Sequence, residues 1–175
     1  RINQIGGVTW STPFKALKSK YLTNYIISTD LNKIKKVSEG CGADVPFLRP
    51  KDLSSDSASS VAALQHAVNF MEKLKNIKFD YIIEIMCTNP LKKSTDIDAI
   101  IKKIILTEAD TVIAIHQLED HHPRRIKKII NDRIVDFCLT EKKESRRQDL
   151  KPKAYIRSGS IYAIKRDFLM KKNAR

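Results

Sequence analysis

The chain has 175 residues, which is enough for a domain with a sizeable hydrophobic core. Its 33 lysines and arginines outnumber its 20 acidic residues, and the formal net charge of +13 favours anionic partners. No apolar run approaches the roughly 20 residues of a membrane span and no signal peptide is visible, so we predict a soluble, cytoplasmic protein.

The cysteines and histidines do not form a metal-binding pattern. The three cysteines are odd in number and lack C-x-x-C spacing, which argues against a disulfide framework and a zinc site. The one histidine cluster is His121-His122, just before Pro123. Adjacent side chains on an extended segment point apart, so we expect a structural or hydrogen-bonding role for this pair.

The chain up to residue 115 alternates helical and strand patterns. Gly6-Gly7 ends an irregular opening, and Ser11-Thr12 before Pro13 predicts a short helix through Lys20. Strands are expected at 25–28, 45–48, 81–86 and 111–115, and further helices at 32–39, 57–74 and 95–106. The strand at 81–86 is apolar enough for the middle of a sheet, and we expect 111–115 to be buried as well. This alternation predicts a doubly wound, mostly parallel α/β sheet in three layers.

The pattern changes after Pro123. Two short apolar runs, 126–130 and 134–138, flank Asn131-Asp132 and predict an antiparallel hairpin. The polar segment 141–153 is expected to be an interaction arm or a lid, with disorder as an open alternative. A strand is expected at 154–164, and Gly159 inside it marks a bulge or a close approach to a ligand. We expect residues 1–175 to form a single domain.

Residues 48–60, with the sequence LRPKDLSSDSASS, connect an expected strand to an expected helix. In parallel α/β sheets, ligands bind where strands end and helices begin, because free backbone N–H groups there favour negative charge. The segment is therefore a candidate ligand site. A simpler interpretation is also open: Asp56 or Ser57 caps the helix, Pro50 shapes a turn, and the serines are solvated.

Three arginines lie at expected loop and strand-end positions: Arg49, Arg147 and Arg157. A guanidinium binds carboxylate or phosphate through two parallel hydrogen bonds, so together these residues suit a polyanionic substrate. Each one alone is more often a surface ion-pair partner. The basic balance also allows non-specific nucleic-acid binding, although no zinc-finger spacing or RNA-binding aromatic motif accompanies it.

Six segments in order resemble one known family. LRPKDLSSDSASS is similar to the LRP-x-x-L-[AS]-x-D-[ST]-A-S-S segment of the acylneuraminate cytidylyltransferases, the CMP-sialic acid synthetase family. The other five resembling segments are IISTD at 26–30, TNPL at 88–91, EDHHP at 119–123, RQDL at 147–150 and RSGSIY at 157–162. Together they span about residues 21–167, so the resemblance covers most of the chain.

The resemblance implies a Rossmann-like nucleotidyltransferase fold and transfer of CMP from CTP to a nonulosonic, sialic-acid-like sugar acid. It also implies Mg²⁺ as a cofactor, release of pyrophosphate, a homodimer with a contact near 141–153, and a role in surface polysaccharide biosynthesis. Carried over by position, it assigns Arg49, Ala58 and Ser60 to the cytidine nucleotide. It assigns catalysis to Arg147 and Arg157, and substrate binding to Met86, Thr88, Asn89, Lys92, Gln148 and Ser158.

The chain also departs from the family pattern. Lys92 stands where arginine is usual, Met86 where glutamine is common, and Ser158 where asparagine is common. The family's phosphate-cradling R-x-G-S-K loop would precede Arg1, and its aspartate-bearing S-I-D-I-D segment for magnesium would follow Arg175. We therefore expect little transferase activity and marginal stability from this polypeptide. An inactive nucleotide-binding homologue and a basic nucleic-acid-binding protein stay open as alternatives.

Overall fold

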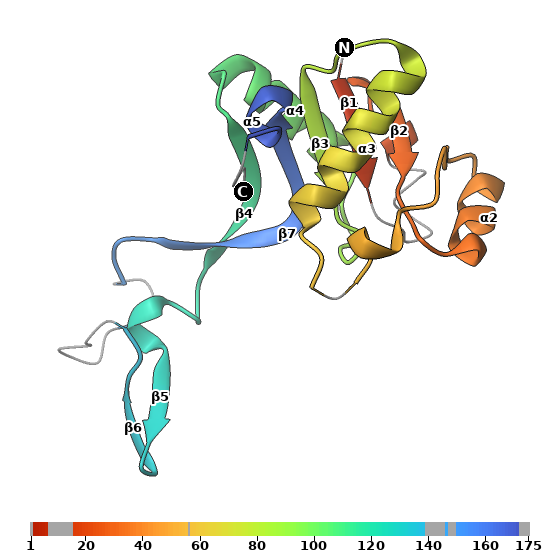
Figure 1. The fold of residues 1–175 in the computed structure, drawn as a ribbon. Coiled ribbons are helices and arrows are strands. Elements are labelled where there is room, and N and C mark those ends of the chain that lie inside the picture. Colours follow the sequence, from red (N-terminus) through yellow and green to blue (C-terminus); the bar gives the residue numbers. More distant parts are fainter. Residues whose placement is uncertain (1, 7–15, 56, 139–145, 147–149, 172–175) are drawn as a thin grey trace. The chain divides into compact units, whose positions relative to one another are not determined.

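The computed structural model describes residues 2–6, for which only the backbone is considered, and residues 16–55, 57–138, 146 and 150–171 (Figure 1). The chain divides into two compact units. The first, which we call the sheet unit, runs up to Ala114 and resumes at Gly159. The second, the hairpin unit, comprises Ile115–Ser158. That residues 1–175 form one domain stays a prediction.

The sheet unit is built on five strands in the order β2-β1-β3-β7-β4. Their bounds are β1 (Ile2–Gly6), β2 (Leu22–Ile27), β3 (Tyr81–Ile85), β4 (Thr111–Leu118) and β7 (Ala154–Lys165). Strand β1 pairs in parallel with both β2 and β3, whereas β7 runs antiparallel to β3. The central position predicted for the strand at 81–86 is confirmed, because β3 has two strands on either side.

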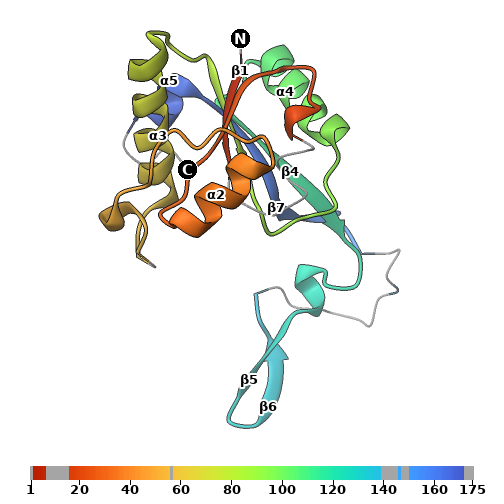
Figure 2. The same ribbon diagram turned by 90° about the vertical axis from the view of Figure 1, so that its right-hand side faces the viewer.

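Helices cover both faces of this sheet, as Figure 2 shows for α3 and α4. The helices are α2 (Asn32–Gly40), α3 (Ser60–Lys75), α4 (Ser94–Thr107) and the short α5 (Arg166–Leu169). Successive side chains of a strand point to opposite faces. Ile82 of β3 accordingly belongs to the cluster that contains Val68 of α3, and Ile83 to the cluster that contains Ile101 of α4. The predicted three-layer α/β architecture is confirmed.

The opening of the chain differs from its sequence-based expectation. Residues 2–6 form β1, a central strand, where the sequence predicts an irregular segment. The polar pair Asn3-Gln4 interrupts the apolar pattern, but pairing with β2 and β3 on both sides satisfies the backbone of this segment. The expectation of marginal stability assumed a sheet without its first strand, so it loses that basis. Most of the helix predicted at 11–20 lies outside the described residues.

Two further expectations about strands are wrong. Residues 45–48 form no named strand. Two isolated bridges, Ile26 with Asp44 and Thr29 with Leu48, join residues 44–48 to β2 and to the residues that follow it. Strand β4, at one end of the sheet, is not buried, and its Ile113 and Ile115 are exposed. An apolar run resembles a buried strand whether it lies at the centre or at the edge of a sheet.

Helix α3 begins at Ser60, three residues later than predicted. Ser59 is its N-cap residue and makes no side-chain capping hydrogen bond. Ser57 therefore does not cap the helix, and Asp56 lies outside the described residues. The part of the simpler interpretation that assigned a capping role to Ser57 is wrong.

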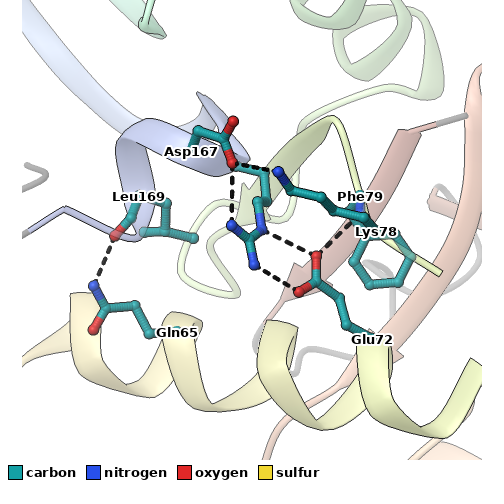
Figure 3. Close-up of polar contacts among 7 residues, drawn as sticks. Gln65, Glu72, Lys78, Phe79, Asp167 and Leu169 are labelled. Atoms are coloured by element: carbon teal, nitrogen blue, oxygen red, sulfur yellow. Dashed lines mark hydrogen bonds and ion pairs between the residues drawn. The ribbon is translucent and has the colours of Figure 1, made fainter. Parts of the chain in front are cut away.

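Polar contacts hold the short helix α5 against α3 (Figure 3). The Gln65 side chain donates to the Leu169 backbone carbonyl over 2.7 Å. The Arg166 guanidinium donates through Nε and Nη2 to the two carboxylate oxygens of Glu72, over 3.1 and 2.8 Å. The same Glu72 carboxylate accepts the Phe79 backbone N–H, so it joins three segments of the sheet unit.

The hairpin unit contains β5 (Lys127–Ile130) and β6 (Arg133–Asp136), preceded by the 3-10 turn η2 (Pro123–Arg125). Ile129 lies opposite Ile134 in the antiparallel register. Asn131 and Asp132 form the two-residue connection with φ angles of 48° and 61°. A tight hairpin turn of this kind requires positive φ at both central residues, and Asn and Asp tolerate it. The predicted hairpin is confirmed.

The hydrogen-bonding role predicted for the histidine pair is confirmed for His122. Its ring is buried, and its Nδ1 accepts the Arg124 backbone N–H over 3.3 Å. Because Nδ1 is an acceptor, the neutral ring carries its proton on Nε2, which donates to the Pro152 carbonyl over 2.9 Å.

Candidate functional site

The carboxyl ends of β1, β2 and β3 meet at one edge of the sheet, because the three strands run parallel. Gly6 at the end of β1 lies opposite both Ile27 of β2 and Ile85 of β3. With strands about 4.8 Å apart, the ends of β2 and β3 are about 10 Å from each other. Ligands of open α/β sheets bind outside this kind of edge.

Residues 48–60 enter at this edge beside β2. Leu48 bridges Thr29, and the Arg49 backbone N–H donates to the Thr29 carbonyl over 2.7 Å. The chain then passes through the 3-10 turn η1 (Lys51–Leu53) and reaches α3 at Ser60. These contacts place Arg49 at the carboxyl end of β2.

Two side chains hold the Arg49 guanidinium. Its Nε donates to Ser54 Oγ over 3.2 Å, and its Nη2 lies 3.8 Å from Asp30 Oδ1. The Ser54 hydroxyl donates in turn to the Pro50 carbonyl over 2.9 Å. A guanidinium carries five N–H donors, and these contacts use its Nε and Nη2 side. Arg49 is thus oriented by its neighbours, with 28% of its side chain accessible to solvent.

Sequence reasoning did not assign roles to Asp30 and Ser54. Asp30 ends the segment IISTD and Ser54 lies inside the 48–60 segment, so both stand in segments that resemble the family. Their contacts with Arg49 depend on side-chain directions, which the sequence does not show.

The N-terminus of α3 lies at the far end of the segment. Ala58 is half-buried and donates its N–H to the Ser55 carbonyl over 2.9 Å, while Ser60, the first residue of the helix, is exposed. The first turn of α3 contains no acidic residue. Because a 16-residue helix concentrates positive partial charge at its N-terminus, this end suits an anionic ligand.

The loop at 86–92 follows β3 at the same edge and leads to α4. The Met86 N–H donates to the Ser160 carbonyl of β7 over 2.9 Å, and the Met86 carbonyl accepts from the Lys92 ammonium. The Asn89 side chain accepts the Leu91 N–H over 3.3 Å. Thr88 is exposed, whereas Lys92 is buried, with 4% of its surface accessible.

The structure therefore gathers seven of the predicted site residues at one edge of the sheet unit: Arg49, Ala58, Ser60, Met86, Thr88, Asn89 and Lys92. Arg157 and Ser158 belong to the hairpin unit, where Arg157 is exposed. Arg147 and Gln148 lie outside the described residues. The roles assigned to all these residues stay predictions.

Within the described ranges, no group of three or more His, Cys, Asp or Glu side chains could hold a metal ion. Among the described helices, none is long and apolar enough to cross a membrane.

Comparison with known proteins identifies the family. A family model described as cytidylyltransferase matches residues 13–171. A pseudaminic acid cytidylyltransferase of Campylobacter jejuni is 30% identical over 163 residues, which cover 89% of this chain and 68% of that protein. The post-translational flagellin modification protein B of Campylobacter coli is 27% identical over 179 residues, with coverages of 99% and 72%.

A CMP-N,N′-diacetyllegionaminic acid synthase of Campylobacter jejuni is 26% identical over 174 residues, covering 99% of this chain and 72% of that protein. Among solved structures, CMP:2-keto-3-deoxy-manno-octonic acid synthetase complexed with CTP matches with a TM-score of 0.63 and 16% identity, over 96% of this chain and 75% of that one. This structural match supports the α/β nucleotidyltransferase fold. The chain belongs to the cytidylyltransferase family of nucleotidyltransferases, as its six ordered segments predict.

Proposed function

We propose that this protein transfers CMP from CTP to a nonulosonic sugar acid and releases pyrophosphate. The observation that carries the proposal is the meeting of the 48–60 segment and the 86–92 loop at the carboxyl edge of β2 and β3. The named activities of the relatives, which act on pseudaminic acid and on N,N′-diacetyllegionaminic acid, indicate the class of acceptor. Because CTP is a cytoplasmic metabolite, we assign the reaction to the cytoplasm.

In this reaction the anomeric hydroxyl of the sugar acid attacks the α-phosphate of CTP. A bond forms between that hydroxyl oxygen and the α-phosphorus, and the bond from the α-phosphorus to the oxygen shared with the β-phosphate breaks. Pyrophosphate leaves with the bonding electrons, and the hydroxyl proton passes to a base. Positioned cations stabilise such transfers by offsetting the charge on the phosphate oxygens.

Each part of the edge has a role in this proposal. Arg49, with Ala58 and Ser60, binds the cytidine nucleotide, and Thr88 and Asn89 separate the nucleotide from the sugar acid beside Met86. For Arg147, Gln148, Arg157 and Ser158, which belong to the hairpin unit or lie outside the described residues, the roles toward the phosphates and the sugar acid rest on the family resemblance alone. The Mg²⁺ that the resemblance implies would be bound mainly through the CTP phosphates, as is common for Mg²⁺, and would offset their negative charge.

A pyrophosphate-release assay tests the proposal. CTP and Mg²⁺ are supplied with pseudaminic acid, N,N′-diacetyllegionaminic acid or N-acetylneuraminic acid, and turnover above the no-acceptor background with at least one of them is expected. The same assay tests the sequence-based expectation of weak turnover. CTP binding by calorimetry without turnover would favour an inactive homologue. Salt-dependent RNA or DNA binding that CTP does not displace would favour the nucleic-acid alternative.

The Arg49→Met variant tests the nucleotide end. Loss of a charge-assisted hydrogen bond is worth about 1.5–3 kcal/mol, so we expect the Kd for CTP to rise about 10- to 100-fold in calorimetry. The control is Lys36→Met on α2, which removes an exposed positive charge outside the 48–60 segment and the 86–92 loop. Equal CTP affinities for the two variants would contradict the role assigned to Arg49.

The homodimer is the second part of the proposal, and we place its contact on one face of the hairpin. This face carries Ile129 and Ile134 directly opposite each other, beside the ion pair of Lys127 with Asp136. The other face carries Lys128 and Arg133. A two-stranded hairpin is marginally stable alone, and a second copy could cover the apolar face without bringing like charges together. The segment 141–153 follows closely in the chain and stays a predicted part of the contact.

A further inference from the structure

The loop at 86–92 is closed by one side chain. The Met86 backbone uses both of its polar groups: its N–H donates to the Ser160 carbonyl over 2.9 Å, and its carbonyl accepts from Lys92 Nζ. Lys92 follows Met86 by six residues, so this contact joins the end of the loop to its beginning. The carboxyl end of the central strand β3 and the start of α4 are thereby held together.

Lys92 is buried, unlike the neighbouring Lys93. Only 4% of its surface is accessible, whereas its neighbour Lys93 is exposed. Moving an ammonium group out of water is costly unless polar partners compensate for it. The Met86 carbonyl provides such a partner, and Lys92 takes part in further interactions as well. The Lys92 ammonium is therefore directed at the protein backbone.

The part of the loop between the two ends faces outward. Thr88 is exposed, and Leu91 is almost fully accessible although it is apolar. Inside the loop, the Asn89 side chain accepts the Leu91 N–H over 3.3 Å. A loop whose side chains are exposed depends on contacts at its ends to keep its shape. The contact of Lys92 with Met86 joins these two ends.

We infer that Lys92 is a positioning residue, which holds the 86–92 loop in the shape that presents Met86, Thr88 and Asn89 to the sugar acid. This revises the substrate-binding role that the resemblance implies for Lys92. The inference rests on the proposed function for its effect on turnover, but its effect on the loop does not depend on any substrate. A displacement of about 1 Å in substrate-positioning groups can cost on the order of 100-fold in rate.

Two variants of Lys92 and one control test this inference. Lys92→Met keeps the length and apolar stem but removes the ammonium. Lys92→Arg keeps a positively charged donor for the Met86 carbonyl. Lys103→Met, on the exposed side of α4, removes a positive charge outside the site. Cooperative thermal unfolding of each variant checks that it is folded.

The first measurement is hydrogen exchange of the peptide covering 86–92, in full-length protein without substrate. We expect its amides to exchange at least about tenfold faster in Lys92→Met, and near the wild-type rate in Lys92→Arg and Lys103→Met. The second measurement is pyrophosphate release. We expect kcat to fall and KM for the sugar acid to rise in Lys92→Met, with KM for CTP nearly unchanged and recovery in Lys92→Arg.

The outcomes separate this inference from the proposed function. Wild-type protein that neither binds CTP nor releases pyrophosphate would refute the proposed function, while hydrogen exchange would still decide whether Lys92 holds the loop. Lost turnover with unchanged exchange in Lys92→Met would mean that the ammonium contacts substrate directly, and would overturn the inference. Faster exchange of the 86–92 peptide in Lys92→Met with normal pyrophosphate release would show that the loop shape does not affect turnover. That result would overturn the part of the inference that concerns catalysis.

Discussion

The sheet unit and the hairpin unit use isoleucine in opposite ways. In the sheet unit, Ile82, Ile101 and Ile104 are completely buried between the sheet and its helices. In the hairpin unit, Ile129 and Ile134 expose 75% and 73% of their surface. The same residue type therefore stabilises the fold of one unit and is available for association in the other. Substitutions at matched positions should separate the two roles.

The largest effect is expected in the core of the sheet unit. Ile101→Ala removes a side chain that packs in the cluster between α4 and the sheet, and we expect the free energy of unfolding to fall by about 2–5 kcal/mol. Leu106→Ala on the same helix is the control, because Leu106 is 82% exposed and its loss should change stability by about 0.5 kcal/mol or less. Urea denaturation measures both. Similar losses would contradict the assignment of this core.

The contact between α3 and α5 should give the next largest effect. Burial raises the pKa of Glu72, but hydrogen bonds from Arg166 and from the Phe79 N–H, with the charges of Arg166 and Lys78, outweigh it and lower the pKa overall. Glu72→Gln keeps the size of the side chain but removes its charge. Since hydrogen bonds to charged groups contribute about 1.5–3 kcal/mol, we expect a loss near the lower end of this range.

The pH dependence gives a sharper test of this pair. A carboxylate whose pKa is lower in the folded state stabilises the protein fully above its unfolded pKa, about 4.3 for Glu, and loses that contribution as the pH falls through the folded-state value. The stability difference between wild type and Glu72→Gln should be constant above about pH 5 and shrink below pH 4.3. The control is Glu39→Gln, in the exposed 3.7 Å pair with Lys35, which should change the free energy of unfolding by about 0.5 kcal/mol or less at pH 7.

The elements of the sheet unit that follow strong periodic patterns were predictable from the sequence. Four of the five isoleucines of α4, at 97, 100, 101 and 104, have the spacing of one helix face, and these four are buried. Strand β1 was not predictable in this way, because Asn3 and Gln4 hide its pattern and its pairing comes from neighbours distant in sequence. The burial expected for the strand at 111–115 was wrong, because its apolar run does not show that β4 lies at one end of the sheet with exposed isoleucines.

The candidate site was predictable to a similar extent. The order of segments along the chain places Arg49 and Thr88 at strand ends, and the parallel pairing of β1, β2 and β3 brings those ends to one edge. The burial of Lys92 was not predictable, because a lysine in a polar loop is normally solvated. Its contact with the Met86 carbonyl depends on the path of the loop between them.

The junction between the two units allows a test of backbone conformation alone. Gly159, the first residue of β7 in the sheet unit, has a φ of +64°, and a Cβ there would meet no atom within 4 Å. Gly159→Ala should thus cost about 1–2 kcal/mol through the left-handed backbone conformation. Gly40→Ala, at the end of α2, also meets no atom within 4 Å, but its φ is not in that region, so it should be neutral or stabilising by up to about 1 kcal/mol. Equal thermal midpoints would contradict this explanation.

The smallest effect on folding is expected from the exposed face of the hairpin. Replacing both Ile129 and Ile134 with threonine keeps β-branched side chains, which suit strands, but removes the apolar pair. The free energy of unfolding of the sheet unit should change by about 0.5 kcal/mol or less, because neither residue packs in its core. Sedimentation velocity should instead show a shift from dimer to monomer at micromolar concentration.

The matched control changes the opposite face of the same hairpin. Ile130 and Val135 lie on the face that carries Lys128 and Arg133, and replacing both with threonine removes a comparable apolar pair. Because two copies meeting on that face would bring positive charges together, this variant should stay dimeric. Monomers from both double variants would indicate that the hairpin itself has lost its structure, and dimers from both would place the contact elsewhere. Only a loss confined to Ile129 and Ile134 supports a dimer that uses the isoleucines the fold leaves exposed.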